Sequence, residues 1–581
     1  MSSVMVPYAF RLLSALLLGA ALPAVAAVEI ELPGLDERLR DAVALSLSLN
    51  EVGEDSSVSD ARIRYLHDRA PEEIRRALSA FSYFNPSIES SLEHQGENWL
   101  ARYSIEPGTR TTIASARLEN RGAGAQDERF QDWLQSPLLQ PGAALDQQGY
   151  EQLKTELLEG AAAAGYYDAR FVRSRIEVNP ATDQAVIELL FDTGPLYRAG
   201  TFSYSEAPVR RSLLERYQTF QPGDPVSTDQ LLQMQRGLID SDYFSSVEIQ
   251  PHWDQPDAQQ RIPIDVNLTP NQRTAYRFGL GYGTDTGARL SARQDRRWVN
   301  DRGHAMDTLV RWSEVSQTFS SQYQIPGPNP LTDRYSVQGL YEKGDTDTAQ
   351  TDTWQLGLQE QKYRGRHRFT YALTLEEETF SFDSDDEQTT TRLLVPELGW
   401  QLTRADNRLD LSRGYRLGVE LSGGARALLS DINFVQVHAE AKGVWSLNAR
   451  WRLLGRLEAG ATGVSDFSQL PASRRFFAGG DSSVRGYGYE TLGPEDSDGD
   501  VRGGRYLLVG SLEVDYRLIE NWRGALFWDA GNAFDSFSTP LKQSLGVGAR
   551  WQSPIGPVRL DLAKPLEDES VRLHFTLGPD L

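Results

Sequence analysis

The stretch with the most distinctive chemistry runs from Phe476 to Glu490, where a single arginine, Arg485, stands among glycines. Its sequence is Phe-Phe-Ala-Gly-Gly-Asp-Ser-Ser-Val-Arg-Gly-Tyr-Gly-Tyr-Glu. So many glycines and serines make a poor strand and no helix, so we predict a loop with tight backbone demands. A guanidinium in such a loop needs a carboxylate partner if it is buried and only water if it is exposed.

The residue types that enzyme or metal chemistry requires are missing or scattered. The chain has no cysteine, which excludes disulfides, thiolate metal sites and thiol catalysis. It has no Gly-x-Ser-x-Gly elbow, which a barrel-anchored hydrolase would carry, and no His-Glu-x-x-His pair. Asp496 to Asp500 are spaced like the start of a calcium loop, but Val501 stands where that loop needs glycine. We therefore expect no catalytic residue, no cofactor and no metal site.

Composition points to an exported protein of several domains. The 581 residues carry a net charge of -22, and the basic surface that a nucleic-acid partner requires is missing. Residues 1–26 have the features of a signal peptide, with Arg11 before an apolar run and Ala24-Val25-Ala26 as the cleavage site. A membrane anchor is the alternative for this segment. No later apolar run reaches the ~18 residues of a spanning helix, so a mature chain in a membrane would have to form a closed β-barrel.

The first part of the mature chain, from Val28 to about Pro270, repeats one pattern three times. A helical segment is followed by an aromatic pair and alternating strands, and the pairs recur about every 80 residues. These pairs are Tyr83-Phe84, Tyr166-Tyr167 and Tyr243-Phe244. The pattern predicts three α+β domains, at residues 27–110, 111–197 and 198–271.

From residue 272 to 581 the sequence alternates apolar and polar residues with almost no helical periodicity. Tyr276, Phe278, Leu280 and Tyr282 alternate with polar residues and glycines, and the last strand places Val571, Leu573, Phe575 and Leu577 on one face. A soluble β-sandwich would show a similar alternation. With a signal peptide in front, we expect instead a transmembrane β-barrel, with room for roughly 12 to 16 antiparallel strands.

Three segments carry a resemblance to a known family. Gly479 to Tyr487 contains the Val-Arg-Gly-Tyr motif of the BamA/TamA superfamily of outer-membrane POTRA-barrel proteins, formed here by Val484, Arg485, Gly486 and Tyr487. Phe527 to Phe534 and Gly546 to Leu566 resemble later segments of that family, and the three N-terminal repeats resemble its POTRA domains. The resemblance implies a barrel of about 16 strands and a loop folded back into its lumen.

For Arg485 the resemblance implies an acidic partner on the inner barrel wall. An unpaired arginine in a water-poor lumen would cost several kcal/mol, so we predict Asp529 as its main partner and Asp561 as the second. A solvated loop residue is the alternative for Arg485.

The resemblance also implies a function. The number of repeats is similar to that of the TamA branch, whose members assist the insertion of β-barrel or autotransporter clients and work with a TamB-like inner-membrane protein. In the family, the first and last strands form a weak lateral seam on which client strands can pair. The corresponding seam residues here are Tyr276, Phe278, Gly279, Gly281, Gly283, Val571, Leu573, Phe575 and Leu577. We thus expect a bacterial outer-membrane assembly factor with periplasmic N-terminal domains. The alternative function is a passive secretion or solute channel. The alternative for the seam is that the barrel merely tapers there.

Overall fold

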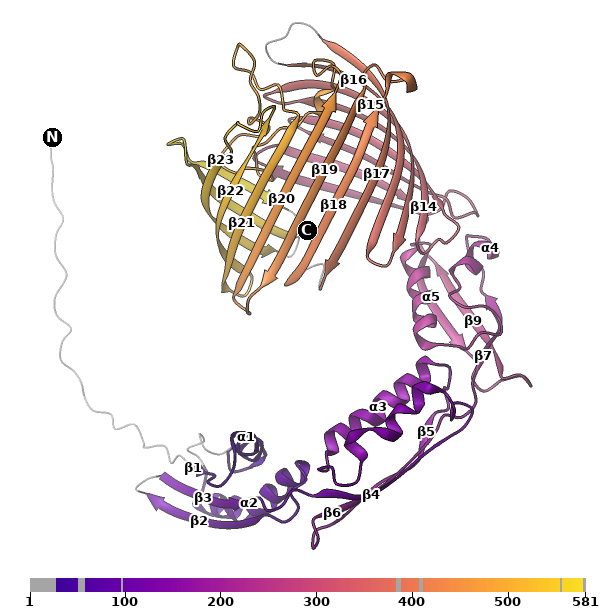
Figure 1. The fold of residues 1–581 in the computed structure, drawn as a ribbon, viewed down its shortest axis with the longest axis vertical. Helices are drawn as coiled ribbons and strands as arrows, with labels where there is room; N and C mark the ends of the chain where they lie inside the picture. The colour runs from indigo at the N-terminus through magenta and orange to yellow at the C-terminus, as the bar shows by residue number, and fades with distance from the viewer. Residues whose placement is uncertain are drawn as a thin grey trace, which may run out of the picture. The chain divides into compact units, whose positions relative to one another are not determined.

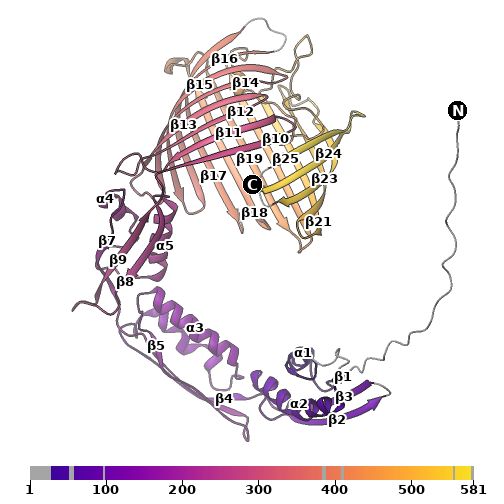
Figure 2. The same cartoon turned by 180° about the vertical axis from the view of Figure 1, so that it is seen from behind.

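A computed structural model describes residues 28–50, 58–95, 98–382, 388–406, 411–553 and 556–577 (Figures 1 and 2). The predicted signal peptide, the acidic run at 383–387 and the terminal residues 578–581 lie outside the described residues. The chain forms two compact units, one made mainly of the segment up to Thr201 and the other mainly of the segment from Ile264 onward. In the described ranges, no helix has both the length and the apolar character needed to cross a membrane.

The first module is a small sheet covered by two helices. Its elements are β1 (Val28–Glu31), α1 (Glu37–Ser46), α2 (Asp60–Ala80), β2 (Ser87–Gln95) and β3 (Asn98–Glu106). The sheet order is β1-β3-β2, and β3 alternates buried and exposed side chains, so one face of the sheet meets the helices. Ile74 of α2 and Tyr103 of β3 are fully buried in the resulting core.

The second and third modules repeat this plan, with the last strand of each in the centre of its sheet. The second module comprises β4 (Thr112–Arg121), η2 (Glu128–Phe130), η3 (Asp132–Gln135), η4 (Pro137–Leu139), α3 (Gln147–Ala163), β5 (Arg170–Asn179) and β6 (Gln184–Asp192). The third comprises β7 (Arg198–Tyr204), α4 (Arg211–Leu214), η5 (Glu215–Tyr217), α5 (Thr228–Asp240), β8 (Phe244–Pro251) and β9 (Arg261–Pro270). Their sheet orders are β4-β6-β5 and β7-β9-β8.

The recurring aromatic pairs end the helical layer of each of these modules. Tyr166 is buried in the core of the second module, whereas its neighbour Tyr167 is exposed and stacks on Trp253 with ring centroids 4.1 Å apart. In the third module Tyr243 is buried and donates a hydrogen bond to the carbonyl of Gly303 at 2.5 Å. The pair therefore supplies one core residue and one contact to a neighbouring segment.

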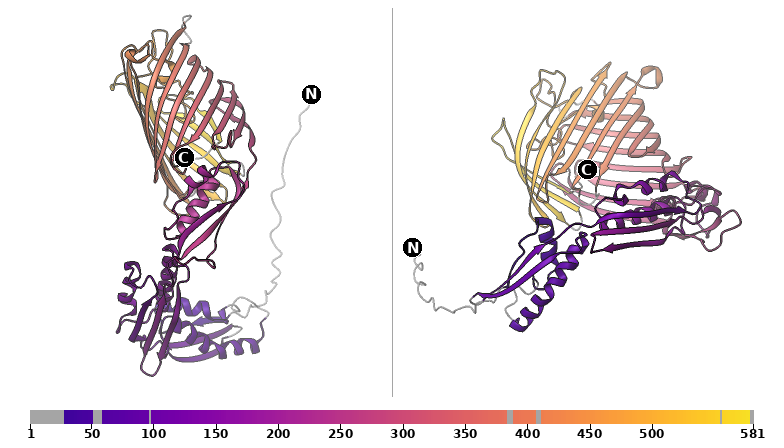
Figure 3. Two further views of the ribbon diagram at one scale, coloured as in Figure 1. Left: turned by 90° about the vertical axis from the view of Figure 1, so that its right-hand side faces the viewer. Right: turned by 60° about the horizontal axis from the view of Figure 1, so that its bottom comes forward.

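The rest of the chain is a barrel of antiparallel strands (Figure 3). The strands are β10 (Thr274–Gly283), β11 (Gly287–Arg296), β12 (Ala305–Ser313), β13 (Ser316–Pro326), β14 (Asp333–Asp345), β15 (Ala349–Arg364), β16 (His367–Phe382), β17 (Thr389–Ala405), β18 (Arg413–Gly424), β19 (Phe434–Ser446), β20 (Trp451–Val464), β21 (Tyr506–Ile519), β22 (Trp522–Phe534), β23 (Lys542–Ser553), β24 (Gly556–Pro565) and β25 (Arg572–Leu577). All 16 strands lie in one sheet in chain order, which confirms the predicted barrel and rules out the sandwich.

The barrel wall has an apolar outside and a polar inside, as the alternation predicts. Phe278 and Leu280 of β10 are each 82% exposed on the outer surface, while the inner wall carries buried Glu376, Asp529 and Asp561. The hydrogen-bonded order of the described strands begins at β10 and ends at β25, and Figure 2 shows these two strands next to each other. The barrel is thus nearly closed, with a seam between its first and last strands.

Candidate functional site

The loop between β20 and β21, residues 465–505, carries Arg485 and is held in a fixed shape by its glycines. Gly479, Gly480 and Gly486 all have positive φ, at 99°, 104° and 96°. A Cβ on Gly479 would lie 2.3 Å from the carbonyl oxygen of Gly488, so only glycine fits there. Val484, next to Arg485, is fully buried in a small cluster with Phe476 and residues of the barrel wall. The loop therefore folds against the inside of the barrel.

Arg485 is buried and bound by carboxylates on three strands. Its Nε and Nη2 donate to Asp529 at 2.7 and 2.9 Å, and its backbone N–H donates to the same carboxylate at 3.1 Å. Nη1 donates to Asp561 at 3.0 Å and to Glu513 at 2.9 Å. Both predicted partners thus lie within hydrogen-bond distance, and Asp529 makes the larger number of bonds. The guanidinium also lies 3.4 Å from the ring centre of Phe527.

A second buried guanidinium, that of Arg550 on β23, completes this cluster. Arg550 donates to Glu513 at 3.0 and 2.8 Å and also to Asp561. Two arginines and three carboxylates therefore form one network across β21, β22, β23 and β24. Such a network stabilises the barrel only when every charge has its partner, since each buried ion loses several kcal/mol of hydration.

A second anchor of the same loop was not predicted from the sequence. Arg474 donates to Glu376 at 2.8 Å and pairs with Glu397 at 3.4 Å, on β16 and β17. The backbone N–H of Ser473 donates to buried Glu378 at 3.1 Å. The available sequence signal was a pair of adjacent arginines just before Phe476 together with glutamates on the polar face of a strand. The loop is thus bound to two separate parts of the wall.

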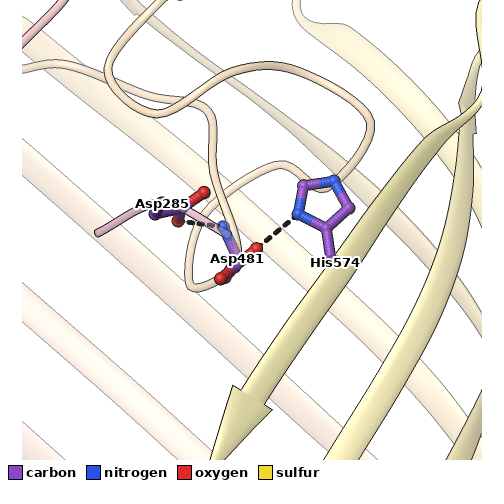
Figure 4. A group of neighbouring side chains, drawn as sticks. All are labelled: Asp285, Asp481 and His574. Carbon is purple, nitrogen blue, oxygen red and sulfur yellow. Dashed lines mark hydrogen bonds and ion pairs between the residues drawn. The ribbon is translucent and has the colours of Figure 1, made fainter. Parts of the chain in front are cut away.

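A third contact of the loop lies at the seam, where Asp285, Asp481 and His574 meet (Figure 4). Asp285 follows β10, Asp481 belongs to the loop and His574 lies in β25. Each of the three residues offers one atom that could bind a metal, and these atoms lie within 4.8 Å of one another. This cluster could therefore hold a metal ion. No metal site was predicted from the sequence, and these three residues were not expected to meet.

The residues predicted to line the seam occupy its two sides. Tyr276, Phe278, Gly279, Gly281 and Gly283 lie on β10, Leu573, Phe575 and Leu577 lie on β25, and Val571 immediately precedes β25. The aromatic and apolar side chains of β10 point outward, and the described part of β25, at 6 residues, is shorter than any other described strand of the barrel.

The model of the Omp85 superfamily domain matches residues 264–580, and that of POTRA domain TamA domain 1 matches residues 29–107. The outer membrane protein assembly factor BamA of Neisseria meningitidis serogroup B is 23% identical over 524 residues, covering 76% of this chain and 63% of that protein. BamA of Nitratidesulfovibrio vulgaris is 31% identical over 173 residues, covering 27% of this chain and 22% of that protein.

The chain therefore spans less than two thirds of the length of either relative. Among solved structures, the crystal structure of BamA from Haemophilus ducreyi lacking POTRA domains 1-3 matches with a TM-score of 0.66 at 17% identity. That match covers 81% of this chain and 99% of the other, and it shows a shared fold.

Proposed function

The chain belongs to the Omp85 superfamily, and from this premise we propose that it is an assembly factor that helps β-barrel or autotransporter clients to insert into or cross the outer membrane. It is an outer-membrane protein whose POTRA domains lie in the periplasm. Clients would dock on these domains and then pair with an unpaired strand edge at the seam.

The observation that carries this proposal is the seam itself. Among the residues that the structure describes, the sheet ends at β10 on one side and at the 6-residue β25 on the other, so the barrel has two strand edges that are not paired with each other as in a closed barrel. A strand edge presents unpaired N–H and C=O groups, on which an incoming strand can form its own hydrogen bonds. Gly279, Gly281 and Gly283 reduce side-chain packing on β10 and support a weak junction.

A passive secretion or solute channel is less well supported, because the loop fills part of the lumen. Arg485 and Arg474 bind the loop to the C-terminal strands and to β16 and β17. A channel would have to move both anchors before a solute could pass freely.

Within the superfamily, we propose that the chain is a TamA-like member. The match of residues 29–107 to the first TamA POTRA domain and the presence of three modules support it. On this assignment the first module, residues 27–110, would dock a TamB-like periplasmic partner. Loss of co-purification with such a protein on deletion of residues 28–105 would test the docking.

A reversible crosslink across the seam tests the main proposal. A Cβ on Gly283 would lie 3.8 Å from the carbonyl oxygen of Phe575, and Thr576, the next residue, shares the inner face of β25 with His574. Gly283→Cys with Thr576→Cys therefore places two thiols on the same side of the junction. The chain has no cysteine of its own, so no other thiol interferes. We expect the oxidised pair to stop insertion of an unfolded barrel client into proteoliposomes and reduction to restore it.

The matched control places a disulfide between two neighbouring strands of the wall, away from the seam. Ala292 on β11 and Val310 on β12 are direct partners, so Ala292→Cys with Val310→Cys adds a disulfide without touching the seam. Client insertion at the wild-type rate with the seam crosslinked would reject a lateral mechanism, and solute flux that persists unchanged in the crosslinked protein would favour a channel instead.

A further inference from the structure

The rim of the barrel holds its first and last strands together through one aspartate of the loop. Thr284, directly after β10, donates from its hydroxyl to Asp481 at 2.8 Å. His574 of β25 contacts the same carboxylate through Nδ1 at 2.5 Å (Figure 4). The backbone N–H of Asp481 donates to Asp285 at 2.6 Å. Asp481 thus lies between the two strands and is bonded to both sides.

A second link joins the strands directly. The backbone N–H of Phe575 in β25 donates to the hydroxyl oxygen of Thr284 at 3.1 Å. Thr284 therefore accepts from β25 while it donates to Asp481, which makes its hydroxyl the common point of both links.

The hydrogen bonds define the proton on His574. Its Nε2 lies 2.8 Å from the backbone N–H of Gly486, and this nitrogen must accept because the amide can only donate. The ring proton is therefore on Nδ1, which donates to Asp481. His574 is only 2% exposed, and both of its nitrogens are bonded to the loop.

The hydrogen bonds of His574 disfavour a metal ion at this cluster. A cation bound by His574 would take the lone pair of Nδ1 and would put the ring proton on Nε2. That proton would then face the N–H of Gly486, so metal binding would replace a hydrogen bond with two opposed donors. The cluster is arranged for hydrogen bonding.

We infer that Asp481 is a latch residue, which closes the outer end of the seam by holding Thr284 and His574, and which releases the seam when the loop moves. This inference rests on the proposed seam mechanism. Asp481 lies four residues before Arg485, and Gly486, directly after Arg485, holds the other side of His574. The buried anchor of Arg485 therefore fixes the position of the latch, so that loop movement and seam opening are coupled.

Hydrogen exchange of the full-length protein, measured by mass spectrometry in lipid nanodiscs, tests the latch without any client. Thr284→Val removes the hydroxyl at nearly constant shape, and Asp481→Ala removes the carboxylate. We expect both variants to exchange at least tenfold faster in peptides covering 274–283 and 572–577, with β16 and β17 unchanged. Thr284→Ser should restore the wild-type rate, and Ser482→Ala, at the exposed neighbouring position, should leave it unchanged.

Wild-type exchange at the seam in Thr284→Val, with a barrel that still migrates as a folded species on cold gels, would overturn the latch. Addition of Zn²⁺ or of a chelator should not alter the exchange. Slower exchange with Zn²⁺ that is lost in His574→Gln would also overturn it, in favour of a metal clasp. Because no client is present, failure here is distinct from failure of the insertion assay.

Discussion

Removing the Arg485 side chain should destabilise the barrel more than any other single change in the loop. Arg485→Ala breaks four side-chain bonds to carboxylates, two with Asp529 and one each with Glu513 and Asp561. Arg550 still bonds to Glu513 and Asp561, whereas Asp529 loses both of its guanidinium bonds. Breaking one partner of a buried ion network costs about 3–5 kcal/mol, most of it from the charges left unpaired.

Two further variants separate charge from geometry. Arg485→Lys keeps the charge but offers a compact ammonium in place of the planar fork, so it should recover about half of the loss. Asp529→Asn combined with Arg485→Ala removes one of the stranded charges, so the double variant should be less unstable than the sum of the single losses.

The assay is the fraction of folded barrel that survives increasing denaturant, measured by its faster migration on cold gels. Arg505→Ala is the matched control, because Arg505 belongs to the same loop and its pair with Asp535, at 3.7 Å, is more than one third exposed. Arg505→Ala should lower the free energy of unfolding by less than ~1 kcal/mol. If Arg485→Ala lowers the free energy of unfolding by no more than Arg505→Ala does, the buried network does not stabilise the barrel. The same conclusion follows if the loss in the double variant equals the sum of the losses in the two single variants.

Three other outcomes are expected. Arg474→Ala should leave Glu376, 1% exposed, without its cation and cost about 3 kcal/mol, seen as faster protease cleavage within residues 465–505. Burial, followed by the charge of Asp481, raises the pKa of Asp285 in its rim turn from 3.8 to about 6. The folded protein therefore binds this proton more tightly than the unfolded chain, and stability rises as the pH falls towards about 4. Asp285→Asn should accordingly stabilise the folded barrel at pH ~7 by about 1 kcal/mol, after allowance for solvent screening, and much less below pH ~5, as denaturant midpoints would report. Tyr167→Ala should remove the stacking on Trp253, worth about 1 kcal/mol, and speed hydrogen exchange in residues 252–260, with Tyr65→Ala, an exposed tyrosine of the first module, as control.

Much of the barrel can be predicted from the sequence, because the alternation of apolar and polar side chains within each strand is a local pattern. Side chains of a strand alternate between faces, so Phe278 and Leu280 can be assigned to the outside from β10 alone. The pairing of Arg485 with Asp529 was accessible because a familiar motif implies a lumen loop and an acidic wall residue.

The other contacts of the loop depend on how far each strand is shifted along its neighbours. The alternation of apolar and polar residues along a strand does not encode that shift. Glu513 lies on the polar face of β21, but its height relative to Arg550 on β23 follows from the stagger of the whole sheet. Arg474 and Glu376 are 98 residues apart in the chain. His574 alternates correctly between Leu573 and Phe575, yet nothing in its own strand indicates that Asp481 will reach it.

The two anchors of the loop divide the barrel into parts of unequal freedom. Arg474 and Arg485 bind the loop to β16, β17, β21, β22 and β24 through ion pairs. On the side of β10 to β14, the described hydrogen bonds to the loop come from the rim turns, at Thr284, Asp285 and Thr348. If the seam opens, the C-terminal strands, joined by the buried network, would stay in place while the part of the loop around Asp481 releases Thr284. The N-terminal strands would then move away from β25, together with the third module, which leads directly into β10.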